Sequence, residues 1–114
     1  MKFSKYYIDS TFCRIHNKKT AALSEMLKKY NNTLVEFNEE SGFTPEVMLK
    51  RLEGYVAEIN NSNRGRDVVL RMERFCTCDN VIRFSFIDNP NTGEAVAGFT
   101  LFPVKRIVDL EEML

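Results

Sequence analysis

The chain has 114 residues, and its sixteen basic side chains balance sixteen acidic ones. This length fits one domain, residues 1–114, that is large enough to bury a hydrophobic core. The neutral balance argues against a strongly basic DNA-binding protein and against an acidic DNA mimic.

Targeting signals are not evident in the sequence. No apolar run is long enough to span a membrane, and the N-terminus MKFSKYYIDS lacks the apolar centre of a signal peptide. We therefore expect a cytoplasmic protein without membrane contact. In that compartment the three cysteines should be reduced thiols rather than a disulfide framework.

Residues 2–16 are compatible with two interpretations. KFSKYYI can form a strand, with Asp9-Ser10 as a turn and TFCRIH as its partner strand. Alternatively, Phe12 and Ile15 continue the following helix toward the N-terminus. We favour a short strand or extended segment.

Residues 18–40 carry apolar side chains at helical spacing: Leu23, Met26, Leu27, Tyr30, Leu34 and Phe37. The spacing predicts one helix over this range. Asn31-Asn32-Thr33 is a weak point in helix propensity. Ser41-Gly42 provides the expected end, because glycine readily takes the left-handed C-cap conformation.

A second helix has a well-marked start at Thr44, which is a natural N-cap and is followed by Pro45 at the first helical position. Its predicted buried stripe consists of Met48, Leu52, Tyr55, Val56 and Ile59. Gly54 is unfavourable inside a helix and suggests close approach by another backbone. The helix should stop in Asn60-Asn61-Ser62-Asn63.

Residues 67–103 contain three segments in which apolar and other side chains alternate with the period of two that a strand requires. These segments are DVVLRMERFC, NVIRFSFID and EAVAGFTLFP. Short turn-forming stretches at 76–80 and 88–93 separate them and predict an antiparallel meander. The expected core face carries Val68, Leu70, Met72, Ile82, Phe84, Phe86, Ala97, Phe99 and Leu101.

After Pro103 the spacing becomes helical again, through residues 104–114. The sequence therefore predicts an α+β domain in which two N-terminal helices pack on a three-stranded antiparallel meander, with a short C-terminal helix.

Cys13, His16, Cys76 and Cys78 together have the ligand composition of a structural zinc site. The spacing is unfavourable, because Cys-x-Cys is tighter than the roughly two to four residues that usually separate zinc ligands. In the alternative interpretation, Cys13 and Cys76 are small buried side chains, as free cysteines often are. We expect no metal and no cofactor.

Catalytic motifs are likewise not recognisable. A nucleophile–base pair of Cys13 and His16 would need an orienting group and an oxyanion hole, and nothing marks either. No glycine-rich phosphate loop is present. We therefore expect a non-enzymatic protein.

The face of the predicted sheet opposite the core mixes apolar and arginine side chains: Val69, Arg71, Phe75, Arg83, Ile87 and Phe102. Such a mixture is typical of interface centres. It predicts an interaction surface, unless the chain's own N-terminal or C-terminal segment covers it. The two strand edges would also allow pairing with a second copy, so a homodimer is one form of the partner.

These observations favour a regulator or inhibitor that binds another protein, of a kind that phages and mobile elements also carry. A nucleic-acid-binding regulator is the alternative, because Arg64, Arg66, Arg71, Arg74 and Arg83 cluster around the first two segments. A simpler account of part of that cluster is a cross-strand charge ladder of Arg71, Glu73 and Arg83.

Overall fold

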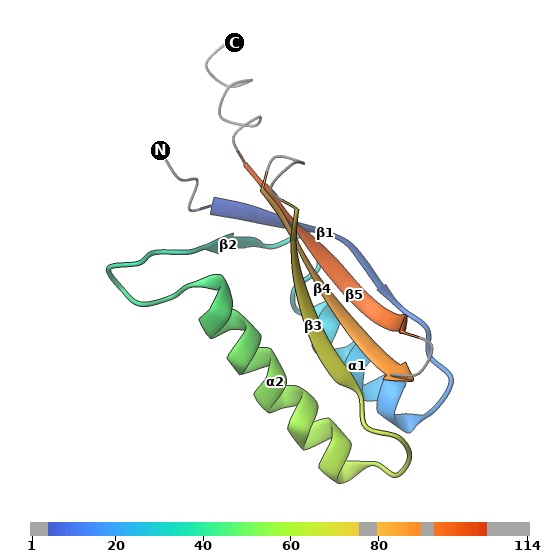
Figure 1. Cartoon of the computed structure of the whole chain (residues 1–114). Helices are drawn as coiled ribbons and strands as arrows, with labels where there is room; N and C mark the ends of the chain where they lie inside the picture. The colour runs from blue at the N-terminus through green and yellow to red at the C-terminus, as the bar shows by residue number, and fades with distance from the viewer. Residues whose placement is uncertain (1–4, 76–79, 90–92, 105–114) are drawn as a thin grey trace.

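The computed structural model describes residues 5–75, 80–89 and 93–104, which form two layers (Figure 1). One layer is an antiparallel sheet with the strand order β2-β1-β5-β4-β3. The strands are β1 (Lys5–Cys13), β2 (Leu34–Glu36), β3 (Val69–Phe75), β4 (Val81–Asn89) and β5 (Glu94–Pro103). The other layer consists of α1 (Lys18–Lys28) and α2 (Pro45–Ser62), which both pack on the same face of the sheet.

The predicted arrangement of two N-terminal helices on a three-stranded meander is wrong. The described sheet has five strands, and β1 lies inside it, between β2 and β5. Tyr6 and Ile8 of β1 are buried in the core, as an alternating strand requires. The turn proposed at Asp9-Ser10 is instead a bulge, because Asp9 pairs with Thr100 whereas Phe12 pairs with Gly98.

The first helix ends at Lys28 rather than continuing to residue 40. Asn32 adopts a left-handed conformation (φ 59°), and its N–H donates to the carbonyl of Ile8 at 3.2 Å. The chain then enters β2, where Val35 pairs with Tyr6. Backbone pairing with β1 thus prevails over the helical spacing of the side chains, and the Asn31-Asn32-Thr33 stretch is where the change occurs.

The start of α2 is confirmed. The hydroxyl of Thr44 accepts from the N–H of Val47 at 3.3 Å, and Pro45 is the first helical residue. Met48, Leu52 and Val56 are buried as predicted.

Two expectations for the same helix are wrong. Tyr55 is 47% exposed rather than buried. Gly54 has no neighbouring atom within 4 Å of the position a Cβ would take, so no other backbone approaches it closely.

The three predicted strands of residues 67–103 are present as β3, β4 and β5, paired in sequence order. Their core-facing side chains join those of both helices in one cluster, in which Phe84, Phe86 and Phe99 are fully buried. Tyr30 stacks on Phe99 with ring centroids 5.8 Å apart. Val96, which alternation places on the opposite face, belongs to this cluster because β5 is bulged beside Ile87.

The predicted C-terminal helix falls almost wholly on residues 105–114, outside the described residues. Neither α1 nor α2 is both long and apolar enough to cross a membrane.

Candidate interaction surface on the helix-free face of the sheet

The face of the sheet opposite α1 and α2 is called the helix-free face below. One apolar residue from each strand forms a row across it: Leu34, Tyr7, Phe102, Val81 and Phe75. Tyr7 pairs with both Leu34 and Phe102, Phe75 pairs with Val81, and the β4–β5 register puts Val81 beside Phe102. Leu34 is 66% exposed and Phe102 is 38% exposed. This apolar row therefore crosses all five described strands and remains accessible to solvent.

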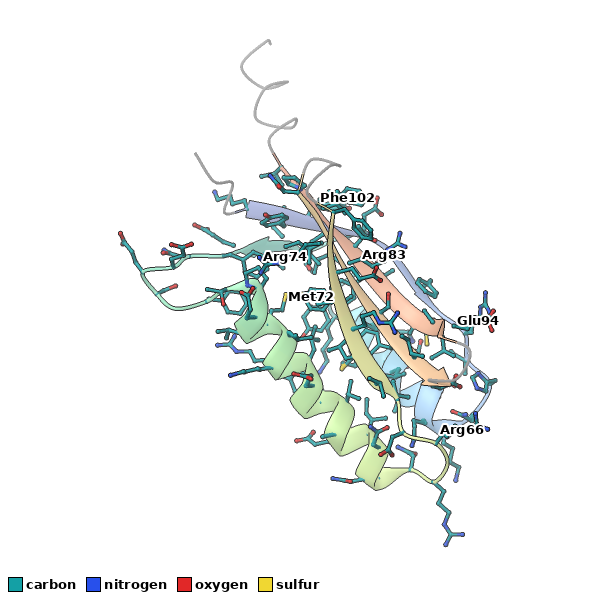
Figure 2. The ribbon with its side chains drawn as sticks, in the orientation of Figure 1. Arg66, Met72, Arg74, Arg83, Glu94 and Phe102 are labelled. Carbon is teal, nitrogen blue, oxygen red and sulfur yellow. The ribbon has the colours of Figure 1, made fainter. Side chains whose placement is uncertain are left out.

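A second row, next to the apolar row, carries charge. Glu73, Arg83, Thr100 and Asp9 follow one another across four strands. The guanidinium of Arg83 also lies over the ring of Phe75, 5.9 Å from its centroid, which is within the range of a cation–π contact. In Figure 2, Arg83 and Phe102 project from this side of the sheet, whereas Met72 and Arg74 point toward α2. Charge and aromatic surface are thus adjacent on the helix-free face.

The charges of this face are balanced. Its described strand residues include three basic and three acidic side chains: Lys5, Arg71, Arg83, Asp9, Glu36 and Glu73. A face of mixed sign is suited to a protein surface rather than to a uniformly negative phosphate backbone.

Phe12 contributes a further aromatic ring, which lies over Gly98. A Cβ at Gly98 would be 3.0 Å from Cε1 of Phe12 and 2.7 Å from the carbonyl oxygen of Phe84. Glycine at position 98 therefore lets the ring lie against the backbone of the sheet. The Phe12 ring remains exposed on its outer side.

Five of the six residues predicted for the interaction surface are accessible on the helix-free face, namely Val69, Arg71, Phe75, Arg83 and Phe102. Ile87 is the exception, because it is 3% exposed, although it does not belong to the core cluster. Their role in binding remains a prediction. Tyr7, Phe12 and Leu34 were missed because they lie in β1 and β2, which the sequence patterns did not separate from turn and helix.

The described N-terminal segment is part of the sheet and does not cover this face. β1 is a strand of the sheet, so residues 5–13 leave the helix-free face uncovered. Residues 105–114 lie outside the described part of the chain.

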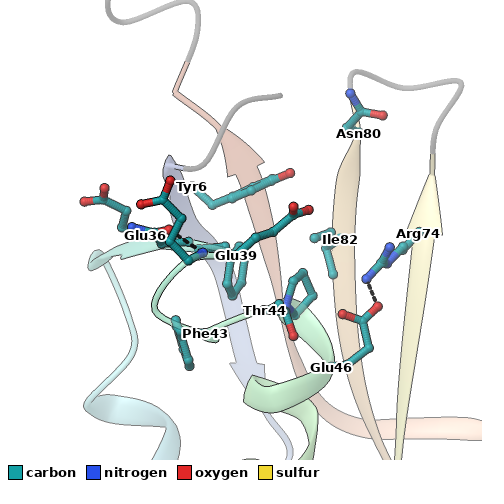
Figure 3. Close-up of a pocket in the computed structure, with 13 residues that line it drawn as sticks. Tyr6, Glu36, Glu39, Phe43, Thr44, Glu46, Arg74, Asn80 and Ile82 are labelled. Atoms are coloured by element: carbon teal, nitrogen blue, oxygen red, sulfur yellow. Dashed lines mark hydrogen bonds and ion pairs between the residues drawn. The ribbon is translucent and has the colours of Figure 1, made fainter. Parts of the chain in front are cut away.

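A pocket of about 770 Å³ lies on the other side of the sheet, where α2 begins (Figure 3). Its apolar lining consists of Tyr6, Phe37, Phe43 and Ile82. The ring centroids of Tyr6 and Phe37 are 5.3 Å apart. Burial raises the pKa of the Tyr6 hydroxyl, and the charge of Arg74 lowers it to a smaller extent.

The rim of this pocket is acidic, with Glu39, Glu40 and Glu46. Glu46 forms an ion pair with Arg74 of β3. Nowhere in the described residues do three His, Cys, Asp or Glu side chains gather as metal ligands.

Of the four candidate zinc ligands, Cys13 and His16 lie in the described part of the chain, and each contacts a group other than a candidate ligand. The thiol of Cys13 donates to the carbonyl oxygen of Thr20 at 3.3 Å. Nε2 of His16 lies 3.1 Å from a carboxylate oxygen of Asp88, at the end of β4 that is distant from Val81. Cys76 and Cys78 lie outside the described residues.

The arginines considered for nucleic-acid binding are dispersed. Arg64 and Arg66 precede β3, Arg74 lies on the helix side with Glu46, and only Arg71 and Arg83 are on the helix-free face. Arg83 is directly opposite Glu73 on the neighbouring strand.

No protein-family model, curated protein or solved structure matches this chain.

Proposed function

We infer that this protein is a small non-enzymatic binding domain that recognises another protein through the helix-free face. The observation that supports this most directly is the apolar row, which runs from Leu34 to Phe75 across the sheet. The proposal includes a regulatory or inhibitory role in the cytoplasm.

Binding through this face is favoured because its exposed apolar side chains stand on a backbone that is already ordered. Fully burying an exposed leucine or phenylalanine side chain contributes about 1.5–3 kcal/mol, and Leu34 and Phe102 would each gain the share that corresponds to the area they still expose. Because these residues stand on paired strands, little backbone entropy is lost when a partner binds. Aromatic and arginine side chains are also the types that dominate binding energy at interface centres.

The mixture of charges indicates what the partner should look like. Arg71 and Arg83 favour acidic groups on the partner, while Glu73 and Asp9 favour basic ones. We therefore expect a partner surface with an apolar centre and charges of both signs around it.

Affinity capture from the native host, with quantitative mass spectrometry, tests this proposal. The test variant combines Leu34→Lys with Phe102→Lys, and Tyr55→Lys on α2 is the control because Tyr55 is also an exposed aromatic residue. Circular dichroism checks that all three proteins are folded. A protein captured by the wild type and by the control, but lost by the test variant, supports the proposal. Capture that the double substitution leaves unchanged refutes it.

Nucleic-acid binding, the alternative, predicts a different result. Fluorescence anisotropy with single- and double-stranded oligonucleotides at low salt should show no binding at micromolar protein concentrations. If binding is seen, and if it weakens steeply with salt and is abolished by Arg71→Glu with Arg83→Glu, the partner is a nucleic acid.

A further inference from the structure

Strand β3 is an edge strand that has charged side chains but no bulge and no proline to protect its edge. Its residues pair with β4 without a register shift from Val69 to Phe75. The strand contains no proline or lysine, both of which commonly block edge-to-edge association. By contrast, the opposite edge is the three-residue strand β2. The longer of the two described edges is thus the less protected one.

The side chains of β3 on the helix-free face have a self-complementary order. Val69, Arg71, Glu73 and Phe75 read apolar, basic, acidic and apolar, and Met72 lies at the centre of the series. Arg71 and Glu73 are exposed, and neither forms an ion pair with another described residue. An antiparallel copy of the same strand would present the opposite charge to each of them.

We propose that two copies of this protein pair edge to edge through β3, antiparallel, about a twofold axis at Met72. Arg71 of each copy then faces Glu73 of the other, and Val69 faces Phe75. Directly opposite residues of antiparallel strands have Cβ atoms about 4.5–5.5 Å apart, which is within reach of an ion pair. Because the two copies are related by a twofold axis, each of these contacts occurs twice in the dimer.

The pairing also fits the helix side of β3. Leu70 and Met72 are half-buried against the core, so a neighbouring strand would cover the part that is still exposed. Leu70 would face Arg74 of the second copy, and Arg74 is already neutralised by Glu46 within its own chain. Paired residues of the two strands lie on the same side, so the two sheets become continuous and their helix-free faces adjoin. This interface lies at the edge of β3, and it shares Arg71, Glu73 and Phe75 with the surface proposed for the heterologous partner.

Exchanging the charges of Arg71 and Glu73 tests the proposed pairing. Sedimentation equilibrium should show the wild type as a dimer that dissociates on dilution. Arg71→Glu or Glu73→Arg alone should weaken the dimer at least about tenfold, because each creates two like-charge pairs. The combination of both substitutions restores opposite charges and should recover most of the affinity. Lys50→Glu on the exposed side of α2 is the control and should have no effect.

Disulfide cross-linking tests the register independently. The three native cysteines are first replaced by serine. Met72→Cys should then give a covalent dimer on mild oxidation, because the two thiols meet at the axis. Leu70→Cys should not, because the two introduced thiols would be separated by the length of about four residues, roughly 13 Å. A monomeric wild type, or a dimer insensitive to the charge changes and cross-linked equally from both positions, would overturn the proposal.

Discussion

The ammonium group of Lys19 donates a hydrogen bond to the carbonyl oxygen of Arg66, 2.8 Å away. Lys19 is 3% exposed, and its ammonium is also 3.4 Å from the carbonyl oxygen of Gly65 and 3.9 Å from a carboxylate oxygen of Asp67. A buried charge is tolerated only where such partners surround it. The contact joins the first turn of α1 to the loop that leads into β3, and it therefore fixes the position of the edge strand.

Replacing Lys19 by methionine should destabilise the fold. The substitution keeps most of the apolar stem but leaves the carbonyl groups of Gly65 and Arg66 without their donor, which costs about 1–3 kcal/mol. Urea denaturation followed by circular dichroism measures this. Lys18→Met, an exposed neighbour in the same turn, should change stability little. Equal effects of the two substitutions would show that the buried hydrogen bonds contribute nothing.

Substitutions of Asn60 should lower the stability of the fold in proportion to the number of side-chain hydrogen bonds they remove. Its nitrogen donates to the carbonyl oxygen of Val68 at 3.0 Å, and its oxygen accepts from the N–H of Val68 at 2.9 Å. Asn60→Asp keeps the acceptor and removes the donor, whereas Asn60→Leu removes both. We predict a loss of about 1 kcal/mol for the first and more for the second, measured by thermal unfolding. Asn61→Leu, on an exposed position, is the control.

Two Gly→Ala substitutions should have opposite signs. At Gly98 an added Cβ would be too close to the carbonyl oxygen of Phe84 and to the ring of Phe12, so we expect a loss of about 1–3 kcal/mol. At Gly54 the space is open, and alanine should stabilise α2 by up to about 1 kcal/mol.

A second substitution separates the two contacts at Gly98. Adding Phe12→Ala to Gly98→Ala should recover only part of the loss, because the backbone oxygen cannot move away as a side chain can. Full recovery would assign the whole effect to the Phe12 ring. Chemical denaturation of Gly98→Ala, Phe12→Ala and the double variant distinguishes these results.

The Cys13 thiol should react slowly. Burial raises the pKa of this thiol, so less of it is thiolate at neutral pH, and alkylation requires the thiolate. Peptide mapping after brief iodoacetamide treatment should show less labelling of Cys13 than of a short peptide with the same sequence. The pKa of this thiol is higher in the folded state than in the unfolded state. Its ionisation therefore leaves the free energy of unfolding unchanged below the usual thiol pKa. That free energy falls as the pH rises from the usual thiol pKa to the folded-state pKa. Rapid labelling at neutral pH would contradict the burial of this group.

The elements that could be predicted from the sequence are those whose signals are local. Thr44 and Pro45 mark the start of α2 within two residues, and the alternation in β4 is uninterrupted from Ile82 to Phe86. The first helix was extended too far because Leu34 and Phe37 stand at helical spacing from Tyr30. That spacing does not reveal that Val35 pairs with Tyr6, almost thirty residues earlier.

The candidate site was predictable in part for the same reason. Residues of β3, β4 and β5 on the helix-free face follow from alternation alone, but the bulge in β1 breaks its alternation between Asp9 and Phe12. Tyr7 and Phe12 were therefore not recognised as part of the surface. Ile87 shows a different limit of the sequence pattern. Alternation predicts on which face of the sheet a side chain lies, but it does not predict whether neighbouring side chains bury it, as they bury Ile87.

Because β1 lies between β2 and β5, the sheet can be completed only after β5 has been synthesised. Tyr6 pairs with Pro103 and Ile8 with Leu101, so this strand forms its longer set of pairs with β5, the described strand that is most distant from it in the sequence. Until β5 is available, the only described strand with which β1 can pair is the three-residue strand β2. Closing a loop of nearly the whole chain is entropically costly, and folds dominated by such distant pairings form slowly. The complete sheet therefore forms only once β5 is available. Before that step β1 has an unpaired strand edge, a feature that makes folding intermediates prone to aggregation.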